Sequence, residues 1–277
     1  MKSDHLPHRC THREDPGYAI APSPSTPFDD AALRQALAGE QFILLYQPVM
    51  DHRRRMVGAE ALIRWRHPDL GLVGPCAFIP QTEQSDLIVA IGDWVLQAAC
   101  RQLAQWQRDD MACRFTMAVN ISARQVRQPD FVERVRGILA ETGAKPSLLK
   151  LELTESMLVG DVDDIIGKMA ALRALGIGFA LDDFGTGYSS LCYLARLPVT
   201  HIKIDRSFVK QMLGTPRMAT IVQALIGLAR ALDLDVVAEG VETEAQFAAL
   251  VACGARQFQG FLFSPPVQVS DLRRWMV

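Results

Sequence analysis

The sequence predicts an α/β fold, a modified TIM (β/α)8-like barrel with an antiparallel first strand. Eight short apolar stretches occur along the chain, and helical patterns separate most of them. Strands separated by helices form parallel sheets, whereas the first two stretches are joined only by a polar turn and should form an antiparallel hairpin. Polar residues also end one apolar stretch after another, and such barrels gather their functional groups at the carboxyl ends of the strands.

The predicted elements follow in chain order. A short helix ends at Gly39, and strand candidates at 42–49 and 56–65 flank a polar turn. A helical stripe of apolar residues covers 86–108. Thr243 and Gln246 have the spacing of a capping box for the last helix, which should stop at Gly254. The six later strands are predicted at 115–121, 149–154, 177–183, 200–204, 235–239 and 257–263, with helices at 131–142, 163–175 and 219–232 among them.

Length and composition predict one main domain. The chain has 277 residues, of which 49% are hydrophobic and 22% are charged, and this suits a single barrel with one large core. Residues 21–27 are rich in proline and serine, so 1–27 are expected to be a disordered tail and 28–277 the functional domain. The tail residues His5, His8, Cys10 and His12 match no closed zinc pattern.

Charge and cysteine usage narrow the class of protein. The net charge of -2 and the pI near 6.3 argue against binding of a nucleic-acid polymer, although a small phosphate ligand remains compatible. The six cysteines show no CxxC spacing, which fits a reducing cytoplasm. No apolar signal core and no run near 18 apolar residues occurs, so the chain is expected to be cytoplasmic and not inserted in a membrane.

A set of polar residues marks the ends of the predicted strands. A single carboxylate at a strand end is usually a helix cap or a surface ion-pair partner. Independent caps would not recur at the same end of seven strands, and a buried carboxylate is costly unless a cation compensates it. A metal site is therefore the economical interpretation. The residues are Glu60, Asn120, Glu152, Asp182, Asp183, Lys203, Glu239 and Gln259.

Seven motifs carry a resemblance to a known family. In chain order they are GAEALIRWRHP, VNISARQ, LELTES, LDDFGTGYSS, IKIDRSFV, VVAEGVET and QGFLFSPP. Together, from about residue 46 to 266, they resemble the EAL-domain family of cyclic di-GMP phosphodiesterases. The resemblance implies hydrolysis of cyclic di-GMP to linear pGpG with Mg²⁺ or Mn²⁺. No metal-site position of the family motifs is substituted, which favours an active enzyme.

The resemblance also implies a ligand set for two cations. Glu60, Asn120, Glu152 and Asp182 would hold one ion, and Asp182 would bridge to a second ion held with Asp183 and Glu239. Oxygen ligands of this kind suit Mg²⁺ and Mn²⁺. Two cations roughly 3.5 to 4 Å apart can polarise a phosphodiester, activate a shared water and stabilise the leaving 3′ oxygen.

Lys203 and Gln259 are expected to assist the reaction. Lys203 could contact the attacking water or meet phosphate charge, and the alternative is an ion pair with Asp205 inside the barrel. Gln259 resembles the family residue that positions water near the second metal, and the alternative is a buried amide that satisfies backbone groups.

Four residues are candidates for substrate binding. Arg64 lies four residues after Glu60 on the same strand face, where it could hold a phosphate with two hydrogen bonds. Gln47, Leu62 and Asp205 are also assigned to the ligand site by the resemblance.

Glu155 resembles the glutamate that anchors the loop after the fifth strand of the family's barrel and so supports catalysis. That loop, 184–190, contains two glycines and several hydroxyls, so it could close over the metals, and in the family it belongs to a homodimer interface. Two other functions stay open: a receptor that binds cyclic di-GMP without cleaving it, and a regulator that acts through a protein partner.

Overall fold

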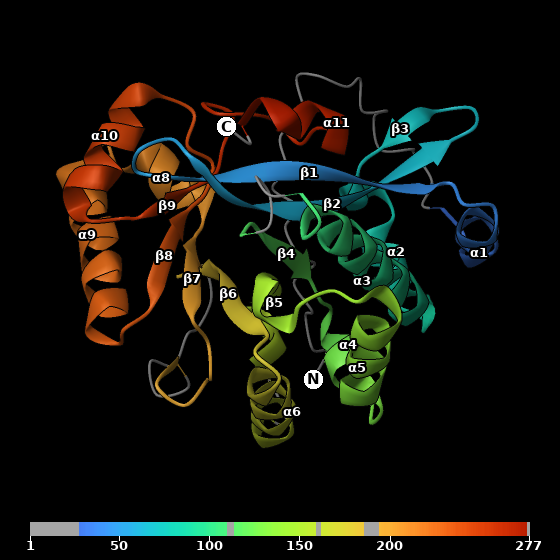
Figure 1. The fold of residues 1–277 in the computed structure, drawn as a ribbon. Coiled ribbons are helices and arrows are strands. Elements are labelled where there is room, and N and C mark those ends of the chain that lie inside the picture. Colours follow the sequence, from blue (N-terminus) through green and yellow to red (C-terminus); the bar gives the residue numbers. More distant parts are fainter. Residues whose placement is uncertain (1–27, 110–113, 159–161, 186–193, 276–277) are drawn as a thin grey trace, which may run out of the picture.

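The computed structural model describes residues 28–109, 114–158, 162–185 and 194–275. Eight strands close into a barrel, and a ninth short strand extends it (Figure 1). This confirms the predicted modified TIM-like barrel. The strands are β1 (Phe42–Asp51), β2 (Met56–His67), β3 (Gly71–Val73), β4 (Thr116–Asn120), β5 (Leu149–Thr154), β6 (Gly178–Phe184), β7 (His201–Ile204), β8 (Asp235–Ala238) and β9 (Gln257–Phe258).

The antiparallel first strand is confirmed. β1 pairs antiparallel with β2 from Phe42 opposite Trp65 to Met50 opposite Met56, and it closes the barrel by pairing antiparallel with β9. Parallel pairing runs from β2 to β4 and then strand by strand to β9. All strands of the barrel except β1 therefore present their carboxyl ends at one mouth.

Helices surround the strands. In Figure 1, α9 and α10 lie outside β8 and β9, and α3 and α5 cover the opposite flank. α10 has the predicted capping box of Thr243 and Gln246, and Gly254 caps its end with a left-handed φ of 97°. The helices are α1 (Asp30–Ala38), α2 (Ile79–Thr82), α3 (Leu87–Trp106), α4 (Ala123–Val126), α5 (Phe131–Thr142), α6 (Val162–Ala174), α8 (Arg206–Gln211), α9 (Pro216–Ala231), α10 (Glu244–Cys253) and α11 (Val269–Leu272).

Helix α3 is the one long apolar helix of the described chain. It is long and apolar enough to pass a length-and-composition test for a membrane span, although core helices pass the same test. More than half of the apolar stretch of α3 is buried inside the protein, and α3 packs on β4 and α5. Buried side chains of α3 such as Ile91, Leu96 and Leu103 belong to the main core.

Several features differ from the predicted elements, among them the short helices α2, α4 and α11, which were not predicted. The strand expected at 257–263 ends at Phe258, because the peptide groups that follow bond to the segment after β8: Val241 donates to the Gln259 carbonyl, and Leu262 donates to the Val241 carbonyl. The short strand β3 and the six-residue helix α8 were not predicted. Single-turn helices also occur at Pro75–Ala77, Pro146–Leu148, Glu155–Leu158 and Arg273–Trp275. The expected tail, 1–27, lies outside the described residues.

Candidate active site

The carboxyl ends of the strands open into a cavity of about 290 Å³. Most of the predicted site residues line it, although they come from strands far apart in the sequence. The predicted residues at this wall are Gln47, Glu60, Leu62, Asn120, Asp182, Asp183, Lys203, Glu239 and Gln259. Arg64, Glu152, Glu155 and Asp205 are not part of the cavity wall.

Lys203 lies at the centre of the acidic residues. Its side chain is 2% exposed, and its Nζ is 2.6 Å from Glu152 Oε2 and 2.6 Å from Glu239 Oε1. The same ammonium lies 3.2 Å from Glu60 Oε2 and 3.5 Å from Asp182 Oδ1. These four acids come from β2, β5, β6 and the residue after β8, so the barrel itself brings them together. Glu152 does not line the cavity, but the shared ammonium connects it to the acids that do.

Amide side chains hold Glu60 from two sides. Asn120 Nδ2 donates to Glu60 Oε1 at 2.6 Å, and Gln259 Nε2 donates to Glu60 Oε2 at 2.7 Å. Gln259 Nε2 also donates to Gln47 Oε1 at 2.9 Å, and Gln47 in turn donates to the carbonyl of Ser264. The buried Oε1 of Gln259 has no hydrogen-bond partner in the described part of the chain. This oxygen is therefore a candidate acceptor for a water or a ligand group.

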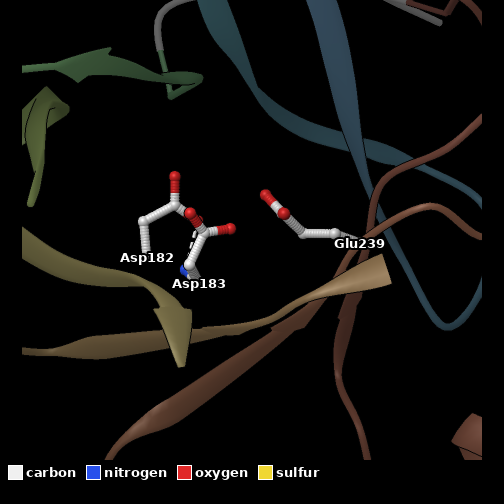
Figure 2. A group of neighbouring side chains, drawn as sticks. All are labelled: Asp182, Asp183 and Glu239. Atoms are coloured by element: carbon white, nitrogen blue, oxygen red, sulfur yellow. Dashed lines mark hydrogen bonds between the residues drawn. The ribbon is translucent and has the colours of Figure 1, made fainter. Parts of the chain in front are cut away.

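A second acidic group forms where β6 ends. Oxygen atoms of Asp182, Asp183 and Glu239 lie within 4.8 Å of one another and could hold a metal ion. Figure 2 shows the two aspartates side by side, with their carboxylates facing that of Glu239. The Asp183 backbone N–H donates to Asp182 Oδ1 at 2.9 Å (Figure 2). The donor atoms are all hard oxygens, so this group fits a cation such as Mg²⁺ or Mn²⁺.

The backbone explains how two consecutive aspartates reach one site. In a regular strand, neighbouring side chains point to opposite faces. Asp183 has a φ of 53°, in the left-handed region, and the pairing of β6 with β7 shifts register between Leu181 and Phe184. Asp tolerates this conformation better than most residues other than glycine. The strand therefore ends with both carboxylates beside Glu239.

Burial and charge perturb the ionisation of these groups. Burial raises the pKa of Glu152 to about 8, and the neighbouring Glu60 and Asp182 add to the increase while Lys203 opposes it. Burial, followed by the charge of Asp182, raises the pKa of Asp183 to about 7. Burial alone would lower the pKa of Lys203, but the surrounding carboxylates raise it well above its usual value. The acidic site thus lacks positive charge, which a bound divalent cation would supply.

Several predicted residues lie elsewhere. Arg64 is fully buried and donates from Nη1 to the carbonyl of Ile63 at 2.8 Å, so its predicted contact with phosphate stays a prediction. Asp205 caps α8 by accepting a hydrogen bond from the Ser207 backbone N–H, and it is not among the ion-pair partners of Lys203 in the described chain. The alternative ion pair between Lys203 and Asp205 is therefore wrong.

Glu155 opens the single turn that follows β5, and this turn packs against the strands β5 and β6. The loop that Glu155 is predicted to anchor lies mostly outside the described residues, which stop at Gly185 and resume at Leu194. The loop-anchor role of Glu155 and the predicted dimer through this loop stay predictions.

The structure adds cavity residues that sequence reasoning missed. Arg206 and Glu242 line the cavity beside Asp183 and Glu239. Their signal was available, because each lies within one of the recognised motifs, but neither ends an apolar stretch. The lining also includes apolar residues, among them Pro75, Ile79, Ile88, Ile91 and Val95.

Comparison with known proteins agrees with this geometry. The sequence pattern described as EAL domain matches residues 30–266. The chain is 46% identical over 241 residues to the bifunctional diguanylate cyclase/cyclic di-GMP phosphodiesterase MucR of Pseudomonas aeruginosa, covering 87% of this chain and 35% of MucR. It is 39% identical over 246 residues to the cyclic di-GMP phosphodiesterase PdeR of Escherichia coli, covering 89% of this chain and 37% of PdeR. The chain thus spans little more than a third of the length of these relatives.

Solved structures show the same barrel. The MucR phosphodiesterase in complex with c-di-GMP superposes with a TM-score of 0.84 at 44% identity, covering 87% of this chain and 98% of that one. The FimX EAL domain from Pseudomonas aeruginosa bound to c-di-GMP gives a TM-score of 0.79 at 25% identity, with 86% and 96% of the two chains covered. The match to the family pattern over most of the chain, together with this likeness, shows that the chain belongs to the EAL domain family.

Proposed function

We propose that this chain is a metal-dependent phosphodiesterase that hydrolyses cyclic di-GMP to linear pGpG. The observation that carries the proposal is the convergence of Glu60, Glu152, Asp182 and Glu239 on the single ammonium of Lys203 at the mouth of the barrel. Relatives named as cyclic di-GMP phosphodiesterases, and a neighbouring structure in complex with c-di-GMP, support the choice of substrate.

The donor sets support two cations, Mg²⁺ or Mn²⁺. The group of Asp182, Asp183 and Glu239 fits one ion. The other would use the carboxylates of Glu60, Glu152 and Asp182 with the side-chain oxygen of Asn120, whose Nδ2 already bonds Glu60. When bound, such cations polarise the phosphodiester and lower the pKa of a water molecule.

The reaction adds water across one P–O3′ bond. The water oxygen bonds to phosphorus, the 3′ oxygen leaves and takes a proton, and the linear product keeps a 5′-phosphate. Within this scheme the chain supplies orientation and charge. Lys203 keeps its proton and holds Glu60, Glu152 and Glu239 together. Gln259 is fixed by Gln47 and Glu60, and its buried Oε1 is available to orient a water.

Turnover of the purified chain tests the proposal. Cyclic di-GMP loss and pGpG appearance are followed by chromatography with Mg²⁺, with Mn²⁺ and with a chelator. Conversion that requires a divalent cation, is lost in Glu152→Ala and persists in Glu133→Ala supports the proposal, because Glu133 is an exposed acid on α5. Binding of cyclic di-GMP without conversion would favour the receptor function, and neither binding nor conversion would refute both.

The predicted homodimer is proposed as part of the same function. Light scattering with and without cyclic di-GMP measures the molar mass of the chain in solution. A monomeric mass at all protein concentrations would refute the homodimer.

A further inference from the structure

Arg206 is a cation of the site that pairs with none of the described acids. Among the described residues that line the cavity, the only side chains with a permanent positive charge are Lys203 and Arg206. Lys203 is held by four carboxylates. Arg206 is half-buried, and it forms no ion pair or hydrogen bond through its side chain with the described part of the protein. A guanidinium in a cavity whose donors no described residue accepts is well suited to bind a ligand.

The backbone beside Arg206 is shaped to receive it. Gly240 follows Glu239 directly, has a φ of 63° and also lines the cavity. A Cβ atom at position 240 would lie 2.3 Å from Arg206 Cβ and 3.2 Å from its Cα. Because no larger residue fits there, glycine lets the Arg206 stem lie against the segment that carries Glu239. The contact places the stem of Arg206 against the residue that directly follows Glu239.

The charges around Arg206 indicate which part of a cyclic dinucleotide it would meet. Asp183, Glu239 and Glu242 line the same cavity as Arg206. In the proposed function the cations held by these acids bind the phosphodiester, so Arg206 is left for another part of the ligand, such as a neutral base. The bases also extend outward from the ring that contains both phosphates, so a base can reach a side chain beyond the metal-binding acids.

We infer that Arg206 determines base specificity by donating two hydrogen bonds to O6 and N7 of one guanine of the substrate. This inference rests on the proposed function. A guanidinium forms this paired contact with guanine, and adenine presents an amino group where guanine has O6. Arg206 would therefore favour cyclic di-GMP over cyclic di-AMP, without taking part in the cleavage of the phosphodiester.

The test compares the two nucleotides in wild type, Arg206→Gln and Lys210→Gln. Lys210 is an exposed cation on the same short helix and does not line the cavity, so its variant removes the same charge as a control. Kd is measured by equilibrium dialysis in Ca²⁺, and kcat and KM are measured in Mg²⁺. In Arg206→Gln we expect the preference for cyclic di-GMP over cyclic di-AMP to fall about tenfold or more in Kd and KM, with kcat little changed. Lys210→Gln should keep the wild-type preference.

Other outcomes overturn the inference. An unchanged preference refutes it, and so does equal weakening for both nucleotides with a shallower salt dependence, which would indicate a phosphate contact. Arg206→Met keeps the aliphatic stem over Gly240 and replaces the Gln variant if that variant melts early. A wild-type chain that binds cyclic di-GMP selectively but does not cleave it refutes the proposed function alone, because the Kd ratio still decides the role of Arg206. A wild-type chain that binds neither nucleotide refutes both.

Discussion

Replacing Lys203 with methionine isolates the charge at the centre of the acidic site. Methionine keeps much of the side-chain length and removes the ammonium that lies 2.6 Å from both Glu152 and Glu239. The lysine side chain is only 2% exposed, so water cannot take over its role. Removing one partner from a buried ionic group costs about 3–5 kcal/mol of stability, because the remaining charges are left uncompensated. In a chain of this size, such a loss lowers Tm by about 10 °C.

The loss should depend on pH in a definite direction. Burial raises the pKa of Glu152 to about 8 from an ordinary value of 4.5. The folded protein therefore holds a proton that the unfolded chain releases, and the stability gained from it is present at low pH and lost as pH rises through about 8. In Lys203→Met the acids depend still more on these protons. The loss of Tm that Lys203→Met causes relative to the wild type should be smaller at pH 6 than at pH 9.

Thermal unfolding in a chelator at both pH values, repeated with millimolar Mg²⁺, measures these effects. Mg²⁺ should recover part of the lost Tm, because a divalent cation compensates the same carboxylates. Lys210→Met, which removes an exposed charge, should unfold like the wild type. A drop of less than about 2 °C at pH 9 would refute the reasoning, since it lies far below the effect of breaking a buried ionic group. If Mg²⁺ leaves the loss of Tm unchanged, Lys203 and the cation do not compensate the same carboxylates.

Four further results are expected. Glu152→Ala should lower turnover by about 10²-fold or more with native circular dichroism, and retention of a tenth of the wild-type rate would contradict its role as a metal ligand. Ca²⁺ should bind without supporting hydrolysis, because it prefers longer bonds and more ligands than Mg²⁺; equal rates in the two ions would count against a site limited by geometry. Glu155→Ala should lose most turnover across a Mg²⁺ series while Tm changes little, and wild-type turnover would reduce Glu155 to a local cap. Gly92→Ala should destabilise the fold by about 1–3 kcal/mol, since a Cβ there would lie 2.1 Å from the Gln125 amide, and an unchanged denaturation midpoint would show that the amide moves aside.

Local sequence signals predicted much of the fold. The capping box of Thr243 and Gln246 and the terminal Gly254 lie where expected, because caps depend on neighbouring residues alone. The antiparallel first strand followed from the short polar turn before Met56. The end of β9 at Phe258 could not be predicted, since it depends on bonds between Gln259 and Val241, and Val241 belongs to a separate segment.

The sequence predicted which residues form the site more completely than it predicted how they contact one another. The position of Asp182 and Glu239 at strand ends was enough to place them at one mouth, because parallel strands share an edge. Glu60, which was also expected at a strand end, lines the cavity from the middle of β2. The sequence could not show that Lys203 pairs with these acids and not with Asp205, since both arrangements fit the alternation of a strand. The motif IKIDRSFV contains Arg206, but the sequence could not show that this residue lines the cavity in close contact with Gly240.

The left-handed backbone at Asp183 makes the two neighbouring acids move together. Asp182 and Asp183 are separated by a single peptide bond, which also donates to the Asp182 carboxylate. A tilt of this peptide near the end of β6 therefore displaces both carboxylates together relative to Glu239, so the two acids move into or out of the site as a pair. Asparagine shares the tolerance of aspartate for this conformation. Asp183→Asn can thus remove the charge and keep the left-handed backbone conformation, whereas alanine would disturb both the charge and the conformation.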